Sequence, residues 1–351
     1  MSEMSQNPVA AVELSKIRAR AVALADAIFE TPVIELASPF ITQLFDTGQV
    51  FLKLECFQKT GTFKARGALS NAHSIPLERW EAGITAVSAG NHAIAAAWAA
   101  RQLGLSAKVV MQSSANPFRV ALAKAEGAEV IFKDGGPAAF AEAERIVREE
   151  RRTLIHPFEG ENVTLGTGGV GLEFIDTVPD LDAVIVGVGG GGLISGVAAA
   201  IKQVNPRCAV YGVEPKGAAS MSLSLAEGRP VTLDRIMTVA DNLAPPMALP
   251  FAFGVIAHYV DNIVTVSDDD ICAGMAIYQE EAKLAVEPAG AAALAGAVGP
   301  LRQRIAGKRI GIVVCGANID TESYLTLTER GRRHISHMAN QQTEDAETSR
   351  S

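Results

Sequence analysis

One lysine of the sequence lies where its amine could react with a carbonyl group. The segment Lys53–Ala68 predicts the end of a strand, a glycine-containing turn and then a helix. Thr62 is a candidate N-cap, so that the helix would start at Phe63. Lys64 then falls in the first helical turn, where the positive end of the helix dipole would lower the pKa of its ammonium group. A neutral amine can form a Schiff base with a carbonyl cofactor, although an ordinary solvated lysine fits the same spacing.

A second segment could bind a carboxylate. Residues 88–93 read Ser-Ala-Gly-Asn-His-Ala and directly follow the expected strand Ile84–Val87. A small-residue loop between a strand and a helix leaves backbone amides free at the helix start. Ser88, Asn91 and His92 could add side-chain donors there, whereas His92 alone is equally compatible with a buried structural histidine.

A third segment predicts a phosphate site. Residues 187–192 read Gly-Val-Gly-Gly-Gly-Gly between an expected strand and an expected helix, and consecutive glycines let backbone amides turn toward a phosphate. The lack of a Gly-Lys-Ser/Thr sequence excludes a Walker P-loop. The spacing Gly187-x-Gly189-x-x-Gly192 also matches a dinucleotide fingerprint, and Glu214 lies at about the distance expected of a ribose contact. A dinucleotide and a phosphorylated cofactor therefore both fit.

The fourth segment is Val313–Asn318, where a last strand runs into a turn of small residues. Cys315 stands at the carboxyl end of that strand, the edge at which α/β proteins bind ligands, although a buried structural cysteine fits as well. The four cysteines are scattered without Cys-x-x-Cys spacing, which favours neither a disulfide framework nor a zinc site.

The elements that must position these segments alternate along the chain. Short β-branched runs alternate with alanine-rich segments, which predicts an α/β fold with mostly parallel sheets flanked by helices. The expected strands are Val50–Leu54, Ile84–Val87, Lys108–Met111, Glu129–Phe132, Ala183–Val188, Ala209–Val213, Ile263–Val266 and Arg309–Val314. The expected helices include Ala93–Leu103, Pro137–Arg152, Leu193–Val204 and Asp268–Glu281.

The same pattern predicts two domains. Residues 81–155 hold compact βα units that suit a small domain, and residues 10–80 and 156–330 would together form a larger, discontinuous one. Residues 331–351 are polar and lack apolar periodicity, which predicts a disordered tail.

Composition excludes several kinds of partner. The 351 residues carry a net charge of −8 without a basic stripe, which argues against a nucleic-acid surface. The longest apolar stretch is too short to cross a bilayer. The polar N-terminus lacks the basic and apolar regions of a signal peptide, so we expect a cytoplasmic protein that has no membrane partner.

Taken together and in this order, the four segments resemble the serine/threonine dehydratase family of pyridoxal-phosphate enzymes, which has a tryptophan synthase β-like fold. The likeness covers roughly Ser15 to Thr328. The motifs that carry it are Gly61-Thr62-Phe63-Lys64-Ala65-Arg66-Gly67-Ala68, Ser88-Ala89-Gly90-Asn91-His92, the glycines 189–192, Glu287-Pro288-Ala289-Gly290-Ala291 and Cys315-Gly316-Ala317-Asn318.

The resemblance implies a site in the cleft between the two domains, with Lys64 as the catalytic Schiff-base lysine. It implies that pyridoxal 5′-phosphate is bound by Phe63, Lys64, Asn91, Gly189, Gly190, Gly191, Gly192, Leu193 and Cys315. The residues implied to bind the substrate are Ser88, Asn91, His92 and Ala93. Some relatives use a glutamate that matches Glu214 in a magnesium site, together with an aspartate that is Ser220 here, so we predict no metal.

The activity implied is α,β-elimination from a 3-hydroxy amino acid similar to threonine or serine, which yields a 2-oxo acid and ammonia. Racemases carry a second serine at the position of Ala89, so dehydration is favoured over racemisation. The loop Ala240-Asp241-Asn242 departs from the family's usual Ala-Asp-Gly, and other loops that face the pocket differ as well, so β-hydroxyaspartate or another modified amino acid is also admissible.

A nicotinamide-dependent oxidoreductase, supported by the glycine fingerprint alone, and a non-catalytic binding protein are the more distant alternatives. By analogy with its relatives, we expect the protein to be a homo-oligomer, either a dimer or a tetramer.

Overall fold

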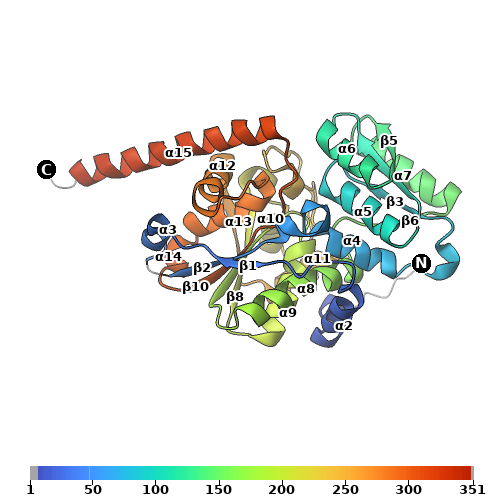
Figure 1. Ribbon diagram of the computed structural model, residues 1–351, viewed down its shortest axis with the longest axis horizontal. Helices are drawn as coiled ribbons and strands as arrows, with labels where there is room; N and C mark the ends of the chain where they lie inside the picture. The colour runs from blue at the N-terminus through green and yellow to red at the C-terminus, as the bar shows by residue number, and fades with distance from the viewer. Residues whose placement is uncertain (1–6, 47, 349–351) are drawn as a thin grey trace.

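Two sheets organise the chain. The computed structural model describes residues 7–46 and 48–348 (Figure 1). The larger sheet has the order β1-β2-β10-β7-β8-β9, and only β1 runs antiparallel to its neighbour. Its strands are β1 (Val33–Glu35), β2 (Gln49–Lys53), β10 (Arg309–Val313), β7 (Ala183–Gly187), β8 (Ala209–Pro215) and β9 (Asn262–Val266).

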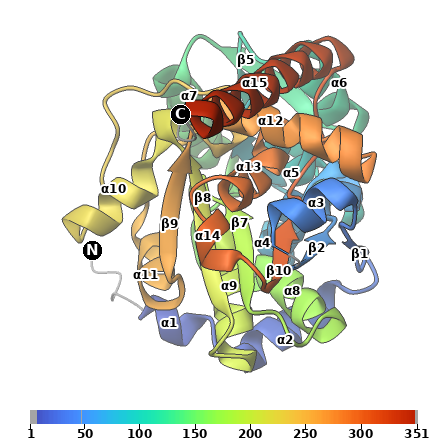
Figure 2. The ribbon, with the colours of Figure 1, turned by 90° about the vertical axis from the view of Figure 1, so that its left-hand side faces the viewer.

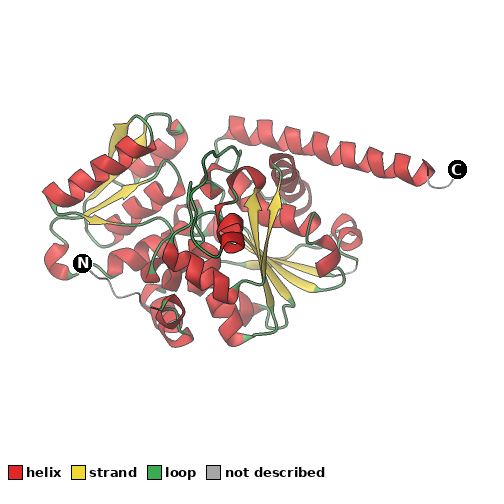
Figure 3. Ribbon diagram, turned by 180° about the vertical axis from the view of Figure 1, so that it is seen from behind, coloured by secondary structure: helices red, strands yellow, loops and turns green. Residues whose placement is uncertain are grey.

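The smaller sheet is parallel throughout, with the order β5-β4-β3-β6. Its strands are β3 (Ile84–Val87), β4 (Ala107–Gln112), β5 (Glu129–Lys133) and β6 (Thr153–Leu154). The helices between them are α5 (Asn91–Gln102), α6 (Pro117–Ala125) and α7 (Gly136–Glu150). Figure 3 shows the two groups of strands well separated, each with helices around it.

The larger sheet is also covered by helices. Those longer than seven residues are α2 (Leu14–Leu24), α8 (Glu161–Thr177), α9 (Gly192–Val204), α10 (Ser220–Glu227), α11 (Pro250–Tyr259), α12 (Asp268–Ile277), α13 (Pro288–Val298) and α15 (Thr321–Thr348). The short helices are α1 (Pro8–Ala11), α3 (Pro39–Leu44) and α14 (Arg302–Ile305). No helix in these described ranges is long and apolar enough to span a membrane.

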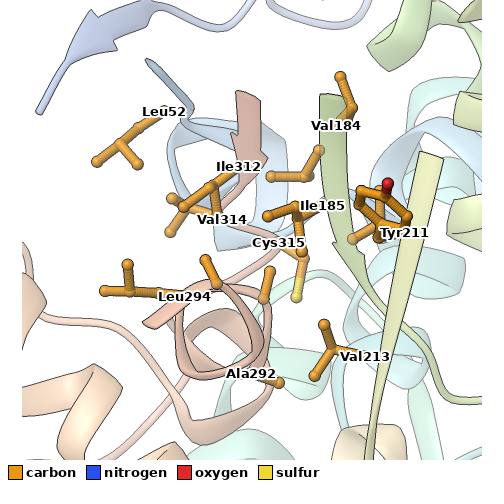
Figure 4. Packing of buried hydrophobic residues seen from close by; sticks show 14 of the residues in the cluster. Leu52, Val184, Ile185, Tyr211, Val213, Ala292, Leu294, Ile312, Val314 and Cys315 are labelled. Atoms are coloured by element: carbon orange, nitrogen blue, oxygen red, sulfur yellow. The ribbon is translucent and has the colours of Figure 1, made fainter. Parts of the chain in front are cut away.

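The predicted α/β class is confirmed, and every strand listed from the sequence is present with its ends displaced by at most two residues. The prediction missed β1 and β6, which have only three and two residues and therefore show little periodicity. The core of the larger sheet is built from β-branched and alanine side chains (Figure 4), with Leu52, Ile185 and Ile312 fully buried on adjacent strands.

The prediction of a disordered tail from residue 331 is wrong for most of its length. Helix α15 continues through Thr348 and lies along α12 (Figures 1 and 2), while the last three residues of the predicted tail, like residues 1–6, fall outside the described part of the chain. Tyr324, Leu327 and Ile335 pack against the core, which anchors the helix. Gly331 permits the contact, because a Cβ there would lie 2.0 Å from the Cys272 carbonyl oxygen.

Helix α4 (Lys64–His73) connects the two halves, because it packs against α8 on one side and α5 on the other. A buried ionic network fixes its first turn. The Arg66 guanidinium donates to both carboxylate oxygens of Glu55, at 2.8 and 2.9 Å, and to both oxygens of Glu173, at 2.6 and 2.8 Å. Lys53 donates to Glu173 at 2.5 Å, so two cations balance two anions.

Replacing Arg66 should make the protein less stable against unfolding. Arg66 and Glu55 are fully buried, and removal of one member of a buried ion pair strands the other charge in a poor solvent. We expect Arg66→Ala to lower the free energy of unfolding by about 3–5 kcal/mol, as measured by urea denaturation. Arg148→Ala, which removes an exposed ion pair with Glu149, is the control and should have little effect. A loss below about 1 kcal/mol for Arg66→Ala would contradict this role of the network.

Candidate active site

The amine of Lys64 lies in the interior between the two sheets. The helix starts at Lys64, one residue later than predicted, but the Thr62 side chain still accepts a hydrogen bond from the Lys64 amide at 3.3 Å. The Lys64 Nζ donates to the Pro157 carbonyl oxygen at 2.7 Å. Burial lowers the pKa of this amine to about 8, opposed by the nearby Cys315 and Glu287. The predicted direction is therefore supported, with burial rather than the helix dipole as its main cause.

A neutral histidine shapes the turn that holds this carbonyl. His156 Nδ1 accepts hydrogen bonds from the amides of Phe158, at 3.3 Å, and Glu159, at 3.0 Å. Burial, together with the nearby Lys64, lowers the pKa of His156 to about 4. The imidazole therefore stays neutral near neutral pH and keeps the acceptor that the turn requires.

The tetraglycine loop forms a cradle between β7 and α9. Gly191 has φ +89°, which an L side chain rarely adopts, and Gly192 opens the helix. A Cβ on Gly190 would lie 2.2 Å from the Phe158 ring, and one on Gly192 would lie 2.7 Å from the Phe158 carbonyl oxygen. The glycines therefore let Phe158 pack directly against the loop, and the amides at the start of α9 can face a phosphate.

Residues 88–92 lie beside this cradle but use many of their polar groups internally. The Asn91 amide group donates to Glu287 Oε1 at 2.6 Å, and Asn91 Oδ1 accepts from Asn318 at 2.8 Å. His92 Nε2 lies 2.8 Å from the Ile155 carbonyl oxygen, and burial, together with Lys64, lowers the pKa of the ring to about 3. The neutral His92 ring thus donates to the Ile155 carbonyl oxygen. The backbone amide of His92 remains as the donor that this residue can offer to a carboxylate.

Cys315 follows the end of β10 by two residues and lines the same space. Its thiol is buried and lies 3.3 Å from the Ala289 carbonyl oxygen. Burial raises the pKa of this thiol, with Glu287 adding to the effect, so the group facing the cavity is neutral.

Two adjoining cavities bring the predicted site residues together. The inner one is lined by Phe63, Lys64, Asn91, Gly189, Gly190, Gly191, Gly192, Leu193 and Cys315. The outer one, of about 560 Å³, also reaches Lys64 and is lined by Ser88 and His92. Ala93 is the exception, because it is fully buried outside both linings and its amide donates to the Gly90 carbonyl oxygen at 3.0 Å.

The further residues that line the inner cavity include Phe158, Asn242 and Glu287, to which sequence reasoning gave no role. Glu287 is buried directly before the proline that opens α13, and it lies 3.5 Å from the Arg119 guanidinium. The motif around Glu287 and the replacement of the family's usual glycine by Asn242 were both visible in the sequence. Neither pattern indicates that the two side chains meet.

Glu214 does not face the glycine loop as a ribose contact would require. Its carboxylate accepts hydrogen bonds from the amides of Met221 and Ser222, both at 2.8 Å, and from the Ser222 hydroxyl at 2.6 Å. The residue therefore caps α10, which accounts for its place near the end of β8 without a dinucleotide. Within residues 7–46 and 48–348, no cluster of three His, Cys, Asp or Glu side chains could hold a metal ion.

Comparison with known proteins assigns the family. The sequence model described as "Pyridoxal-phosphate dependent enzyme" matches residues 24–316. This chain belongs to that family. It is 46% identical over 275 residues to phenylserine dehydratase of Ralstonia pickettii, covering 78% of this chain and 84% of the relative. It is 37% identical to L-threo-3-hydroxyaspartate ammonia-lyase of a Pseudomonas species, covering 80% and 89%. Its fold matches maize serine racemase with TM-score 0.85 and 34% identity, covering 94% and 99%.

The residues present fit pyridoxal phosphate. The amides of the cradle before α9 would hold its phosphate, Lys64 would offer a partly desolvated amine to its aldehyde, and Cys315 would offer a neutral group to its ring nitrogen. The bound cofactor supplies an electron sink for the bond that breaks at the substrate's α-carbon. The chain itself contributes binding, orientation and control of the Lys64 proton.

Filling the cradle should weaken cofactor binding. In Gly190→Ala the new methyl group would overlap the Phe158 ring, so the loop must shift away from its present course. We expect the Kd for pyridoxal phosphate to rise about tenfold or more, as measured by titration of the visible absorbance. Gly136→Ala is the control, because a Cβ there meets only Gln112, at 4.0 Å. Equal affinities for the two variants would contradict the cradle.

Proposed function

We propose that this enzyme eliminates water from a 2-amino-3-hydroxy acid whose β-substituent is apolar and as large as an aryl ring, which yields a 2-oxo acid and ammonia. The observation that carries the proposal is the apolar outer cavity that opens directly onto the Lys64 amine. The similarity of the chain to phenylserine dehydratase supports the same substrate class.

The walls of the outer cavity suit an apolar group. They include Val87, Val110, Phe140, Ile236, Met237, Ala244, Pro245 and Pro246. Phe140 and Met237 keep 55% and 67% of their surface exposed, and they come from α7 and from the segment between α10 and α11. Covering such exposed apolar surface with a substrate ring is favourable by about 25 cal/mol per Å².

Charge argues against a second carboxylate on the substrate. Among the described residues that line the outer cavity, the basic side chains are Lys64 and His92, and the His92 ring is neutral. Asp241 lies in the same lining, and its pairing with Arg119 occupies that guanidinium, so the Arg119 charge is already balanced before an anion enters. Although the chain resembles L-threo-3-hydroxyaspartate ammonia-lyase, we therefore expect 3-hydroxyaspartate to be a poor substrate.

The residues of the site divide the work of elimination. The backbone amides of Ala89 and His92 orient the substrate carboxylate, and Lys64, whose pKa is lowered to about 8, can accept the proton from the α-carbon. The Cα–H and Cβ–O bonds break and water leaves, after which hydrolysis of the released enamine gives the 2-oxo acid and ammonia. Ala89 lines the cavity without an ionisable group, which favours elimination over racemisation.

Cytoplasmic location and homo-oligomeric assembly are also part of this proposal.

A substrate series tests the proposed specificity. We expect kcat/KM to be at least tenfold higher for threo-3-phenylserine than for threonine or serine, and lowest for the 3-hydroxyaspartate isomers. The measurement is the release of 2-oxo acid and ammonia by the holoenzyme, with chiral analysis of the remaining substrate. Phe140→Ala should reduce kcat/KM for phenylserine more than kcat/KM for threonine or serine.

The opposite ranking would reject the aryl assignment while leaving elimination intact. Inversion of the remaining substrate at a rate above oxo-acid release would instead indicate a racemase, as in the relative from maize.

A further inference from the structure

Asn242 stands where the sequence departs from the family's usual glycine, and its side chain joins three segments. It belongs to the short turn Asp241–Leu243, and it lines both the inner and the outer cavity. Its Nδ2 donates to Glu287 Oε2 at 2.8 Å, and its Oδ1 lies 3.4 Å from the Asn91 amide nitrogen. A Cβ on Gly90 would come within 2.3 Å of that Oδ1, so the loop and the Asn242 side chain fit closely.

The carboxyl group of Glu287 is held between two amides. Asn91 donates to one oxygen and Asn242 to the other, at 2.6 and 2.8 Å. Each oxygen accepts a hydrogen bond from an N–H donor, and a carboxylate is a stronger acceptor than a neutral carboxyl group, so the two amides favour the ionised form. Through Oε1, this ionised group fixes the orientation of Asn91 at the start of α5.

The charged and titratable groups around Glu287 come from four other segments. Arg119 on α6 lies 3.5 Å from Oε2, and Asp241 pairs with that same guanidinium. Lys64 on α4 and Cys315 after β10 face Glu287 across the inner cavity. Burial raises the pKa of Glu287 to about 7, with Arg119 opposing and Asp241 adding to the rise. The group therefore titrates where the enzyme would work.

We propose that Asn242 is a positioning residue that keeps Glu287 ionised and thereby holds Asn91 and the Ser88–His92 loop in the geometry that receives the substrate carboxylate. The role of the loop rests on the proposed function, whereas the link from Asn242 to Glu287 rests on the contacts alone. A glycine at position 242 lacks the side-chain N–H donor. Loss of this donor should raise the pH at which Glu287 takes up a proton.

Two substitutions of Asn242 test this link. Asn242→Gly removes the donor, and Asn242→Asp keeps the shape but replaces the donor with a carboxylate. Both should move the acid limb of the kcat/KM pH profile upward by about one pH unit or more, with the larger shift for Asn242→Asp. Independently of substrate, the infrared carbonyl band of protonated Glu287 in the holoenzyme, assigned by its loss in Glu287→Gln, should titrate at a correspondingly higher pH.

Asp241→Asn is the matched control at the neighbouring position. It removes a negative charge that raises the pKa of Glu287 and frees Arg119 to act on Glu287, so the infrared titration should move downward. Unchanged titration in both Asn242 variants, or a shift of the same sign in all three, would overturn the proposal. If the holoenzyme turned over no hydroxy amino acid, the proposed function would fail, while the infrared shifts would still decide the role of Asn242.

Discussion

The structure depends on holding one partly desolvated amine at the junction of two sheets. Lys64 has a backbone carbonyl as its hydrogen-bond partner, and burial lowers its pKa toward neutrality. An ammonium group held this way loses hydration that one carbonyl cannot replace, so the neutral, reactive form becomes accessible. The first turn of α4 must therefore be fixed by something other than Lys64 itself. The buried guanidinium of Arg66 does this from two residues further along the helix.

The surrounding groups keep charge low around this amine. His92 and His156 are both neutral because burial lowers the pKa of each ring, and Cys315 is neutral because burial raises the pKa of its thiol. Glu287 lines the inner cavity with the amine and can carry charge, and the ion pair of Asp241 with Arg119 lies next to it. Electrostatic interactions are strong between buried groups, and Glu287 is almost fully buried, which explains why one amide at position 242 can matter.

The sequence predicted most of the fold because the relevant signals are local. Short β-branched strands and the glycines before α9 are visible in windows of a few residues. The Glu287–Asn242–Asn91 cluster could not be predicted, since its contacts join residues 45 and 196 positions apart with no periodicity between them. Helix α15 was missed for a related reason: its stability comes from the tertiary contacts of Tyr324, Leu327 and Ile335 rather than from a regular apolar stripe.

The central claim is that Lys64 carries the cofactor, and reductive trapping tests it most directly. The holoenzyme would be treated with borohydride and digested, and the peptides analysed by mass spectrometry. The account predicts loss of the visible absorbance and a phosphopyridoxyl group on Lys64 alone. Lys59 lies five residues before Lys64, and its amine lies over the Phe29 ring. A label on Lys59, or a coloured protein that takes up no label, would contradict the account.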